Sequence, residues 1–277
     1  MENSLQKYYR QPKIYLSLPS KGMYYPENGI DGDPKNLPVF GMTAMDEIIF
    51  KTPDALFSGE STVSCIKSCI PAIKDPWQIP QIDLDSILIA IRIATYGQYL
   101  DSNYSCTECK AENGTQLDLT KTLDYFASLE YNPTVDCYPL TVSLRPFNYK
   151  EQTELQHQQY NLRRILLQST GDKDMPEEDR NKKLDEFYNT LAKYQITAYK
   201  KQIATVEADD IRVADAQEIN DFINNSDKGF FQKIKAHLEG QQDAWQVQSQ
   251  TTNCSECSAE NKVKFTLDNS DFFATKS

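Results

Sequence analysis

The strongest constraint on the fold of this 277-residue chain is a sequence repeat that contains two pairs of cysteines. Residues 106–113 read CTECKAEN and residues 254–261 read CSECSAEN, so both follow the pattern C-x-E-C-x-A-E-N. Alternating apolar residues follow each copy, with Leu117 at the position equivalent to Phe265, and each copy then reaches an Asp followed by two aromatic residues. The repeat therefore predicts two copies of one small unit, a tight turn with two thiols followed by a strand.

The spacing of the cysteines is typical of metal binding. Two residues between the thiols allow both sulfurs to bind one ion at about 2.3 Å, and two such turns complete a tetrahedral site that is closed to water. Closed sites are structural, whereas catalytic zinc keeps an open position. The chain has only two histidines, His157 and His237, so a mixed His/Cys catalytic site is poorly supplied. We therefore predict a structural Zn²⁺ held by the four cysteines of the repeat: Cys106, Cys109, Cys254 and Cys257.

The distance between the two pairs leaves alternatives open. Cys109 and Cys254 are separated by 144 residues, whereas ordinary zinc ribbons use about 15–20. We expect the two turns to meet across a long insertion and to pack as similar β-hairpins. The alternatives are two surface turns with free thiols, or a thioredoxin-like redox motif, which should open a helix after a strand.

Three further cysteines lie outside the repeat. Cys65 and Cys69 are four residues apart and share a helix face, and Cys137 precedes an expected strand. Cysteine often behaves as a small buried residue, so we expect all three to pack in the core. The odd total of seven cysteines, without a secretion signal, argues for a reduced compartment.

Composition narrows the possible partners. The chain has 29 Lys and Arg against 40 Asp and Glu, a net charge of −11, and no basic stripe of the kind that nucleic-acid binding requires. Residues 1–25 carry a net charge of +3, which we expect to be a solvated surface; the alternative is an arm that docks on an acidic partner. No stretch approaches the roughly 20 apolar residues of a membrane-spanning helix.

The pattern of elements predicts an α+β fold: an N-terminal mixed domain with a buried helix, a four-cysteine zinc ribbon of two β-hairpin knuckles, and a helical insertion between the knuckles. The expected segments are an N-terminal arm and strand at 1–25, an N-terminal α+β domain at 26–100, a first zinc knuckle with strands at 101–147, the helical insertion at 148–245 and a second zinc knuckle at 246–277.

The buried helix is the clearest single element. Residues 83–96 form a nearly continuous apolar run followed by Gly97, which predicts a helix buried almost all round. Arg92 lies inside this run and should need a carboxylate or carbonyl partner, so we expect a structural ion pair there. Upstream, residues 13–25 predict a strand, a turn and a second short strand, and Thr43 is a good N-cap for a helix.

The insertion is expected to contain mainly helices. Residues from about 148 to 169 and from 181 to 206 carry sparse apolar stripes and predict two long helices that form an antiparallel hairpin. Two shorter helices are expected near 215–225 and 228–239, with Gly240 ending the second. The chain has no phosphate-binding glycine loop, no GxSxG and no HExxH, so we expect no enzymatic activity.

Three motifs in the N-terminal half resemble the baseplate hub assembly proteins of T-even-like contractile-tailed bacteriophages, over roughly residues 14–120. The first is Leu-Pro-Ser-Lys-Gly-x-x-Tyr, the second Met-Thr-Ala-x-(Asp/Glu)-Glu and the third Ala-x-Arg-Ile-x-x-Tyr-Gly. The matching residues are Leu18, Pro19, Ser20, Lys21, Gly22 and Tyr25; Met42, Thr43, Ala44, Asp46 and Glu47; and Ala90, Arg92, Ile93, Tyr96 and Gly97.

The resemblance implies a non-enzymatic role as a hub component or a hub assembly factor. It implies contacts with other phage tail or baseplate hub proteins, the tape-measure protein among them, in the host cytoplasm during assembly or in the virion tail baseplate. The alternative is a zinc-ribbon nucleic-acid-binding or transcription-related module. That alternative predicts a basic face around the knuckles, where the flanking charges are mixed.

Overall fold

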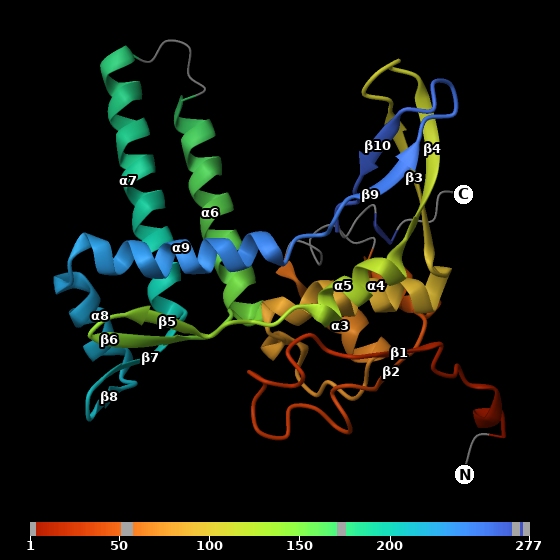
Figure 1. The fold of residues 1–277 in the computed structure, drawn as a ribbon, viewed down its shortest axis with the longest axis horizontal. Helices are drawn as coiled ribbons and strands as arrows, with labels where there is room; N and C mark the ends of the chain where they lie inside the picture. The colour runs from red at the N-terminus through yellow and green to blue at the C-terminus, as the bar shows by residue number, and fades with distance from the viewer. Residues whose placement is uncertain (1–3, 51–57, 171–175, 268–271, 274–277) are drawn as a thin grey trace. The chain divides into compact units, whose positions relative to one another are not determined.

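The computed structural model describes residues 4–50, 58–170, 176–267 and 272–273 (Figure 1). The chain divides into two compact units, the first made of residues 1–130 and 245–277 and the second of residues 131–244. Both units contain helices and strands, and the predicted α+β fold class is confirmed. No helix in the described part is long and apolar enough to cross a bilayer.

The first unit combines the two ends of the sequence. Its described strands pair antiparallel, β1 with β2, β3 with β4, and β9 with β10. Its elements, in chain order, are η1 (Gln6–Tyr8), β1 (Ile14–Leu16), β2 (Leu37–Val39), α1 (Ala44–Phe50), α3 (Glu60–Cys69), η2 (Pro76–Gln78), α4 (Gln81–Tyr96), β3 (Tyr99–Ser105), β4 (Glu112–Asp118), α5 (Leu119–Ser128), β9 (Gln250–Asn253) and β10 (Glu260–Val263).

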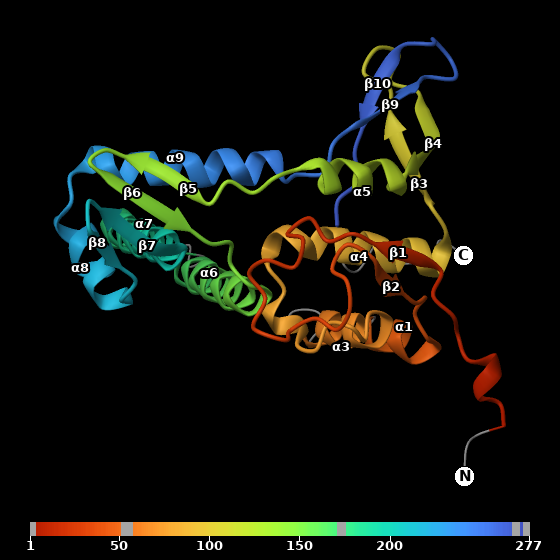
Figure 2. The same cartoon turned by 60° about the horizontal axis from the view of Figure 1, so that its bottom comes forward.

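Helix α4 is the centre of this unit (Figure 2). It contacts α3, α5, β1 and β2, and every residue from Ser86 to Ala94 is buried. Gly97 ends the helix with a φ of 94°, a left-handed value that glycine adopts without strain. The predicted helix, its all-round burial and its glycine stop are confirmed.

The partner of the first strand was predicted wrongly. Residues 23–25 form no strand, and β1 pairs instead with β2, in the register Ile14 to Val39. The intervening chain turns at Lys21 and Gly22, which both have positive φ. Asp83 of α4 holds this turn, because it accepts hydrogen bonds from the backbone N–H of Ser20 at 2.7 Å and from the hydroxyl of Tyr25 at 3.1 Å.

The second unit contains a four-stranded antiparallel sheet in the order β5-β6-β7-β8. Its core lies between one face of the sheet and α8 and α9, and includes Val142 of β6, Val206 of β7 and Ile234 of α9. Its elements are β5 (Thr134–Cys137), β6 (Leu140–Leu144), α6 (Tyr149–Thr170), α7 (Glu177–Lys201), β7 (Ile203–Ala208), β8 (Ile211–Val213), α8 (Ala216–Asn225) and α9 (Lys228–Ala244).

Two expectations for the insertion are corrected. The insertion is not only helical, since residues 203–213 form β7 and β8, so the helix expected to reach residue 206 ends at Lys201. The last helix also runs through Gly240 to Ala244 instead of ending at the glycine. The antiparallel pair of long helices is present, and we call α6 and α7 together the arm (Figure 1).

Candidate metal centre

The two cysteine repeats form two β-hairpins with the same backbone geometry. In the first, the N–H of Cys106 donates to the carbonyl of Ala111 at 2.9 Å and the N–H of Lys110 to the carbonyl of Cys106 at 3.1 Å. In the second, Cys254 and Ser258 make the equivalent two bonds, at 2.9 and 3.0 Å. Lys110 and Ser258 occupy equivalent positions and have φ values of 61° and 59°. The sequence repeat is therefore also a structural repeat.

The hairpins bring the four predicted ligands together. The sulfur atoms of Cys106, Cys109, Cys254 and Cys257 all lie within 4.8 Å of one another. The shortest separations run between hairpins, 3.7 Å from Cys106 to Cys257 and 3.6 Å from Cys109 to Cys254. A tetrahedral ion with bonds of about 2.3 Å requires sulfur separations of about 3.8 Å. The prediction that the two turns meet is confirmed, and four cysteines this close together can hold a metal ion.

Two asparagines join the hairpins across the cluster. Asn113 of β4 donates from Nδ2 to the sulfur of Cys254 at 3.4 Å, and Asn261 of β10 donates to the sulfur of Cys106 at 3.5 Å. Neither residue is among the site residues that the sequence predicts. The available indication was their place in the repeat, because each is the final Asn of C-x-E-C-x-A-E-N.

Further hydrogen bonds connect the two hairpins between strands β4 and β9. The hydroxyls of Thr115 and Thr252 lie 3.1 Å apart. The side chain of Gln250 accepts from the N–H of Asp118 at 2.9 Å and donates to its carbonyl at 2.7 Å, as a backbone strand would. The two hairpins are therefore held together by protein contacts as well as by the geometry of the thiols.

The two halves of the cluster differ in exposure. Cys106 and Cys254 are buried, whereas Cys109 and Cys257 are exposed. The backbone N–H groups of Cys109 and Glu108 lower the pKa of Cys106 to about 6, and the equivalent amides of the second hairpin lower the pKa of Cys254. These amides favour the thiolate, which is the form of cysteine that binds metals.

The remaining cysteines lie away from this cluster. Cys65 and Cys69 are buried on one face of α3, and Cys137 is buried in the core of the second unit. A hydrogen bond with Cys69, together with burial, raises the pKa of Cys65, which keeps it a neutral thiol. All three occupy the core positions that the sequence predicts.

The three family motifs meet around α4. The first motif packs Leu18 in the core and binds Asp83, near the start of α4, through Ser20. The second motif caps α1, where Thr43 accepts from the N–H of Asp46 at 3.2 Å, as predicted. The second and third motifs touch at the end of α4, where the hydroxyl of Tyr96 donates to Glu47 at 3.2 Å.

The expected ion pair of Arg92 is absent from the described residues. Arg92 is 7% exposed, and its Nε and Nη1 atoms are buried with no hydrogen-bond partner in the part of the chain that the structure describes. Its guanidinium lies instead 5.2 Å from the ring centroids of both Tyr96 and Phe272. Burial lowers its pKa. Stacking between two aromatic rings therefore takes the place of the predicted ion pair.

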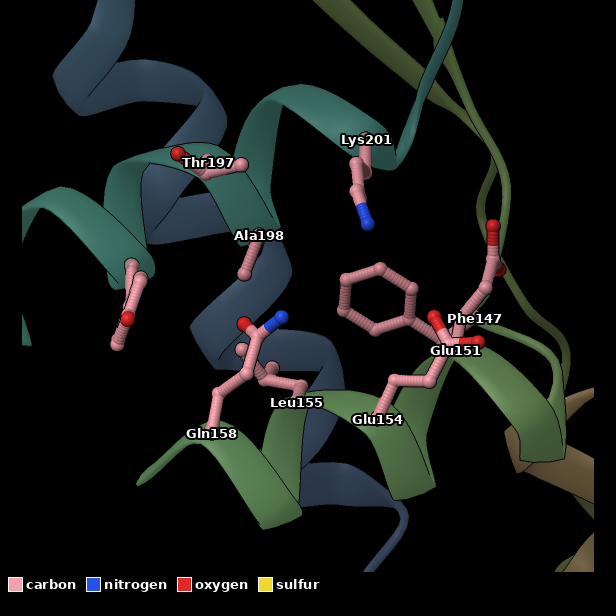
Figure 3. Close-up of a pocket in the computed structure, with 9 residues that line it drawn as sticks. Phe147, Glu151, Glu154, Leu155, Gln158, Thr197, Ala198 and Lys201 are labelled. Atoms are coloured by element: carbon pink, nitrogen blue, oxygen red, sulfur yellow. The ribbon is translucent and has the colours of Figure 1, made fainter. Parts of the chain in front are cut away.

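A small cavity at the base of the arm is a weaker candidate for a functional site. It lies between α6 and α7, where Phe147, Glu154 and Lys201 are among the lining residues (Figure 3). Its volume is about 30 Å³. A space of this size holds about two water molecules, which makes it a weak candidate for binding a substrate. The cysteine cluster remains the stronger candidate.

A cluster of four thiols is typical of proteins in which a metal ion supports the fold. The family described as "T4 bacteriophage base plate protein" matches residues 42–274, and the chain therefore belongs to this family. The resemblance to baseplate proteins is thus confirmed at the level of the family, while the narrower assignment to hub assembly proteins stays a prediction. No curated protein and no solved structure matches the chain.

Proposed function

We propose that the chain is a non-enzymatic component of the phage tail baseplate hub, or a factor that assembles the hub, and that it acts through protein–protein contacts. The observation that carries this proposal is the family match over residues 42–274. The narrower hub role is supported by the three motifs, which resemble those of hub assembly proteins and which all pack around α4.

The proposal includes a structural zinc ion bound by Cys106, Cys109, Cys254 and Cys257. The sulfur separations of 3.6 and 3.7 Å between hairpins support it, because they match the edge of a zinc–thiolate tetrahedron. Four protein ligands would leave no position for water, so the ion would not activate a nucleophile. Its effect would be to join two hairpins that are far apart in sequence.

The position of the second unit in the sequence fits a scaffold that carries an inserted domain. Within the first unit, Phe126 and Trp245 flank the insertion and stack with ring centroids 6.3 Å apart. Within the second unit, Asn132 and Gln241 are joined through two hydrogen bonds of 2.8 Å. The two segments of the first unit that flank the insertion therefore lie close together, as do the two ends of the insertion within the second unit. A metal ion would reinforce the first unit, which contains both flanking segments.

The proposed partners are other phage tail or baseplate hub proteins, including the tape-measure protein. The proposed locations are the host cytoplasm during assembly and the virion tail baseplate. The mixed charges at the knuckles, where Glu108 and Lys110 are both exposed, do not favour the alternative role in nucleic-acid binding.

Affinity purification of the tagged chain from infected cells tests the hub role. We expect tail or baseplate hub proteins to be recovered with the wild-type chain. A tagged chain with Cys254→Ser is the matched comparison, and we expect less recovery because its first unit would lack the metal. Recovery of the soluble wild-type chain without any tail or hub protein would contradict the proposal.

A further inference from the structure

We propose that Asn113 and Asn261 are positioning residues for the metal, each orienting a cysteine thiolate of the opposite hairpin and stabilising it with a hydrogen bond. The inference rests on the proposed metal site and assigns two residues to it that are not ligands. Asn113 binds the sulfur of Cys254 and Asn261 binds the sulfur of Cys106, at 3.4 and 3.5 Å. Each amide therefore donates a hydrogen bond to a thiol of the opposite hairpin.

The orientation of each amide is fixed by its other partners. The Oδ1 atom of Asn113 accepts from both the backbone N–H and the hydroxyl of Ser255 at 2.9 Å, and that of Asn261 accepts from the same two groups of Thr107 at 2.9 and 3.1 Å. A rotated amide would place its NH₂ group against the backbone N–H. The oxygen therefore faces the turn of the opposite hairpin, and the nitrogen must face the sulfur.

Both N–H groups of each amide are also hydrogen-bonded. Nδ2 of Asn113 donates to the carbonyl of Ala111 at 2.8 Å, and Nδ2 of Asn261 donates to that of Ala259 at 2.9 Å. One N–H thus binds the hairpin that carries the asparagine, and the other binds a sulfur of the opposite hairpin. A carboxylate of the same shape could not replace the amide, because it would place acceptors against a carbonyl oxygen and a thiolate.

The two sulfurs that receive these bonds are the ones that water does not reach. Cys106 and Cys254 are 1% and 3% exposed, whereas Cys109 and Cys257 are exposed. Four thiolates around a divalent ion leave a net charge of −2, and buried negative charge requires hydrogen-bond donors. The asparagines supply donors to the buried pair, and solvent can hydrate the exposed pair.

The same contacts explain why the repeat preserves an asparagine in both copies. Each amide binds one cysteine and the residue that follows it, so it holds the opposite turn in the geometry that presents its thiols. Because the two contacts are related by the repeat, we expect Asn113→Asp and Asn261→Asp to have similar effects and the double variant to have a larger one.

The test uses the full-length chain loaded with Zn²⁺. Zinc affinity is measured by competition with a chromophoric chelator, and zinc release is followed from the folded, loaded protein, which does not depend on refolding. We expect Asn113→Asp and Asn261→Asp each to weaken zinc affinity by roughly 10–100-fold, as loss of outer-shell partners does, and to accelerate release. With Co²⁺, the thiolate charge-transfer band should also shift in both variants.

Asn103→Asp is the matched control. Asn103 lies on β3 of the same hairpin and is exposed, so this substitution adds the same charge without removing a bond to sulfur. It should leave zinc affinity within about twofold of wild type. If Asn113→Asp and Asn261→Asp bind and release zinc as wild type does, the positioning role is wrong even if their melting temperatures fall. If the wild-type chain binds neither Zn²⁺ nor Co²⁺, the proposed metal site itself fails.

Discussion

Helix α4 and the arm show two different ways in which a helix is supported. Of the 16 residues of α4, 12 are buried, and the helix is contacted by elements on all sides. In the much longer arm, none of the described side chains between residues 154 and 197 is buried. Several large apolar side chains of the arm are exposed, among them Tyr160, Leu167 and Tyr188.

The difference shows that helix length and tertiary support are separate properties. Isolated helices are marginal in water, and most helical stability in proteins comes from the packing of an apolar face. By this argument α4 should unfold only with the whole first unit, whereas the distal part of the arm should open locally. Substitutions in the two helical regions, and at the groups that stabilise the first unit, can test this contrast.

The largest effect is expected from loss of the metal site. Cys254→Ser removes one of four ligands, and structural zinc sites contribute on the order of 10 kcal/mol of apparent binding energy. We expect the variant to lose its metal and the amides of β3, β4, β9 and β10 to exchange rapidly with solvent, while arm helicity in far-ultraviolet circular dichroism persists. Cys137→Ala removes a thiol in the second unit and should retain the metal. Equal metal content in the Cys254→Ser variant and wild type would contradict the site.

A matched pair of substitutions compares the two helical regions directly. Ile89→Ala in α4 removes a fully buried side chain and should lower the free energy of unfolding by about 2–5 kcal/mol. Leu162→Ala in α6 removes a half-buried one and should cost only about 1 kcal/mol. Chemical denaturation measures both, and hydrogen exchange should show slow amides in α4 and fast ones in the arm. Similar losses of unfolding free energy in the two variants would show that α4 and the arm are supported equally by packing.

The pH dependence of stability tests the buried carboxyl of Asp83. Burial raises its pKa to about 6, although the hydrogen bonds from Ser20 and Tyr25 lower it. Because the folded pKa lies above the unfolded value of about 3.9, this group stabilises the fold fully below pH 4, and the contribution is lost as the pH rises to 6. The free energy of unfolding of wild type, relative to Asp83→Asn, should fall by about 2 kcal/mol between pH 4 and pH 7. A pH-independent difference between the two proteins would show that the carboxyl has an ordinary pKa.

The smallest effect is expected at Arg92. A buried cation without a hydrogen-bond acceptor is costly, while stacking on two aromatic rings contributes roughly 1–2 kcal/mol. Arg92→Met keeps most of the packing volume and removes the charge, so thermal or chemical unfolding should show a change of less than about 1 kcal/mol, or a gain in stability. A loss of 3 kcal/mol or more would instead indicate an ion pair such as the sequence predicts.

The sequence was informative where a local pattern reports directly on structure. The cysteine repeat predicted the four-thiol cluster, because two equivalent units with metal-ligand spacing together supply the four ligands of one ion. The apolar run before Gly97 predicted α4 because a run of this length that ends at a glycine is typical of a helix buried on all sides.

The sequence was less informative where long-range pairing decides the structure. Strand β7 begins one residue after α7 ends, without a glycine or proline between them. It forms because Ile203 and Val206 join a core with β6, α8 and α9. The pairing of β1 with β2 likewise depends on a segment 23 residues away. The stacking of Arg92 on Tyr96 and Phe272 and the contacts of Asn113 and Asn261 with sulfur depend on side chains that meet only after folding.

Elemental analysis of the purified full-length chain by mass spectrometry, with protein concentration determined independently, shows whether the four thiols hold a metal ion. We expect one zinc ion per chain, lost together with the folded ribbon when a strong chelator is added. A properly folded chain that contains no zinc, and whose four repeat cysteines all react at once with a thiol reagent, would contradict this expectation.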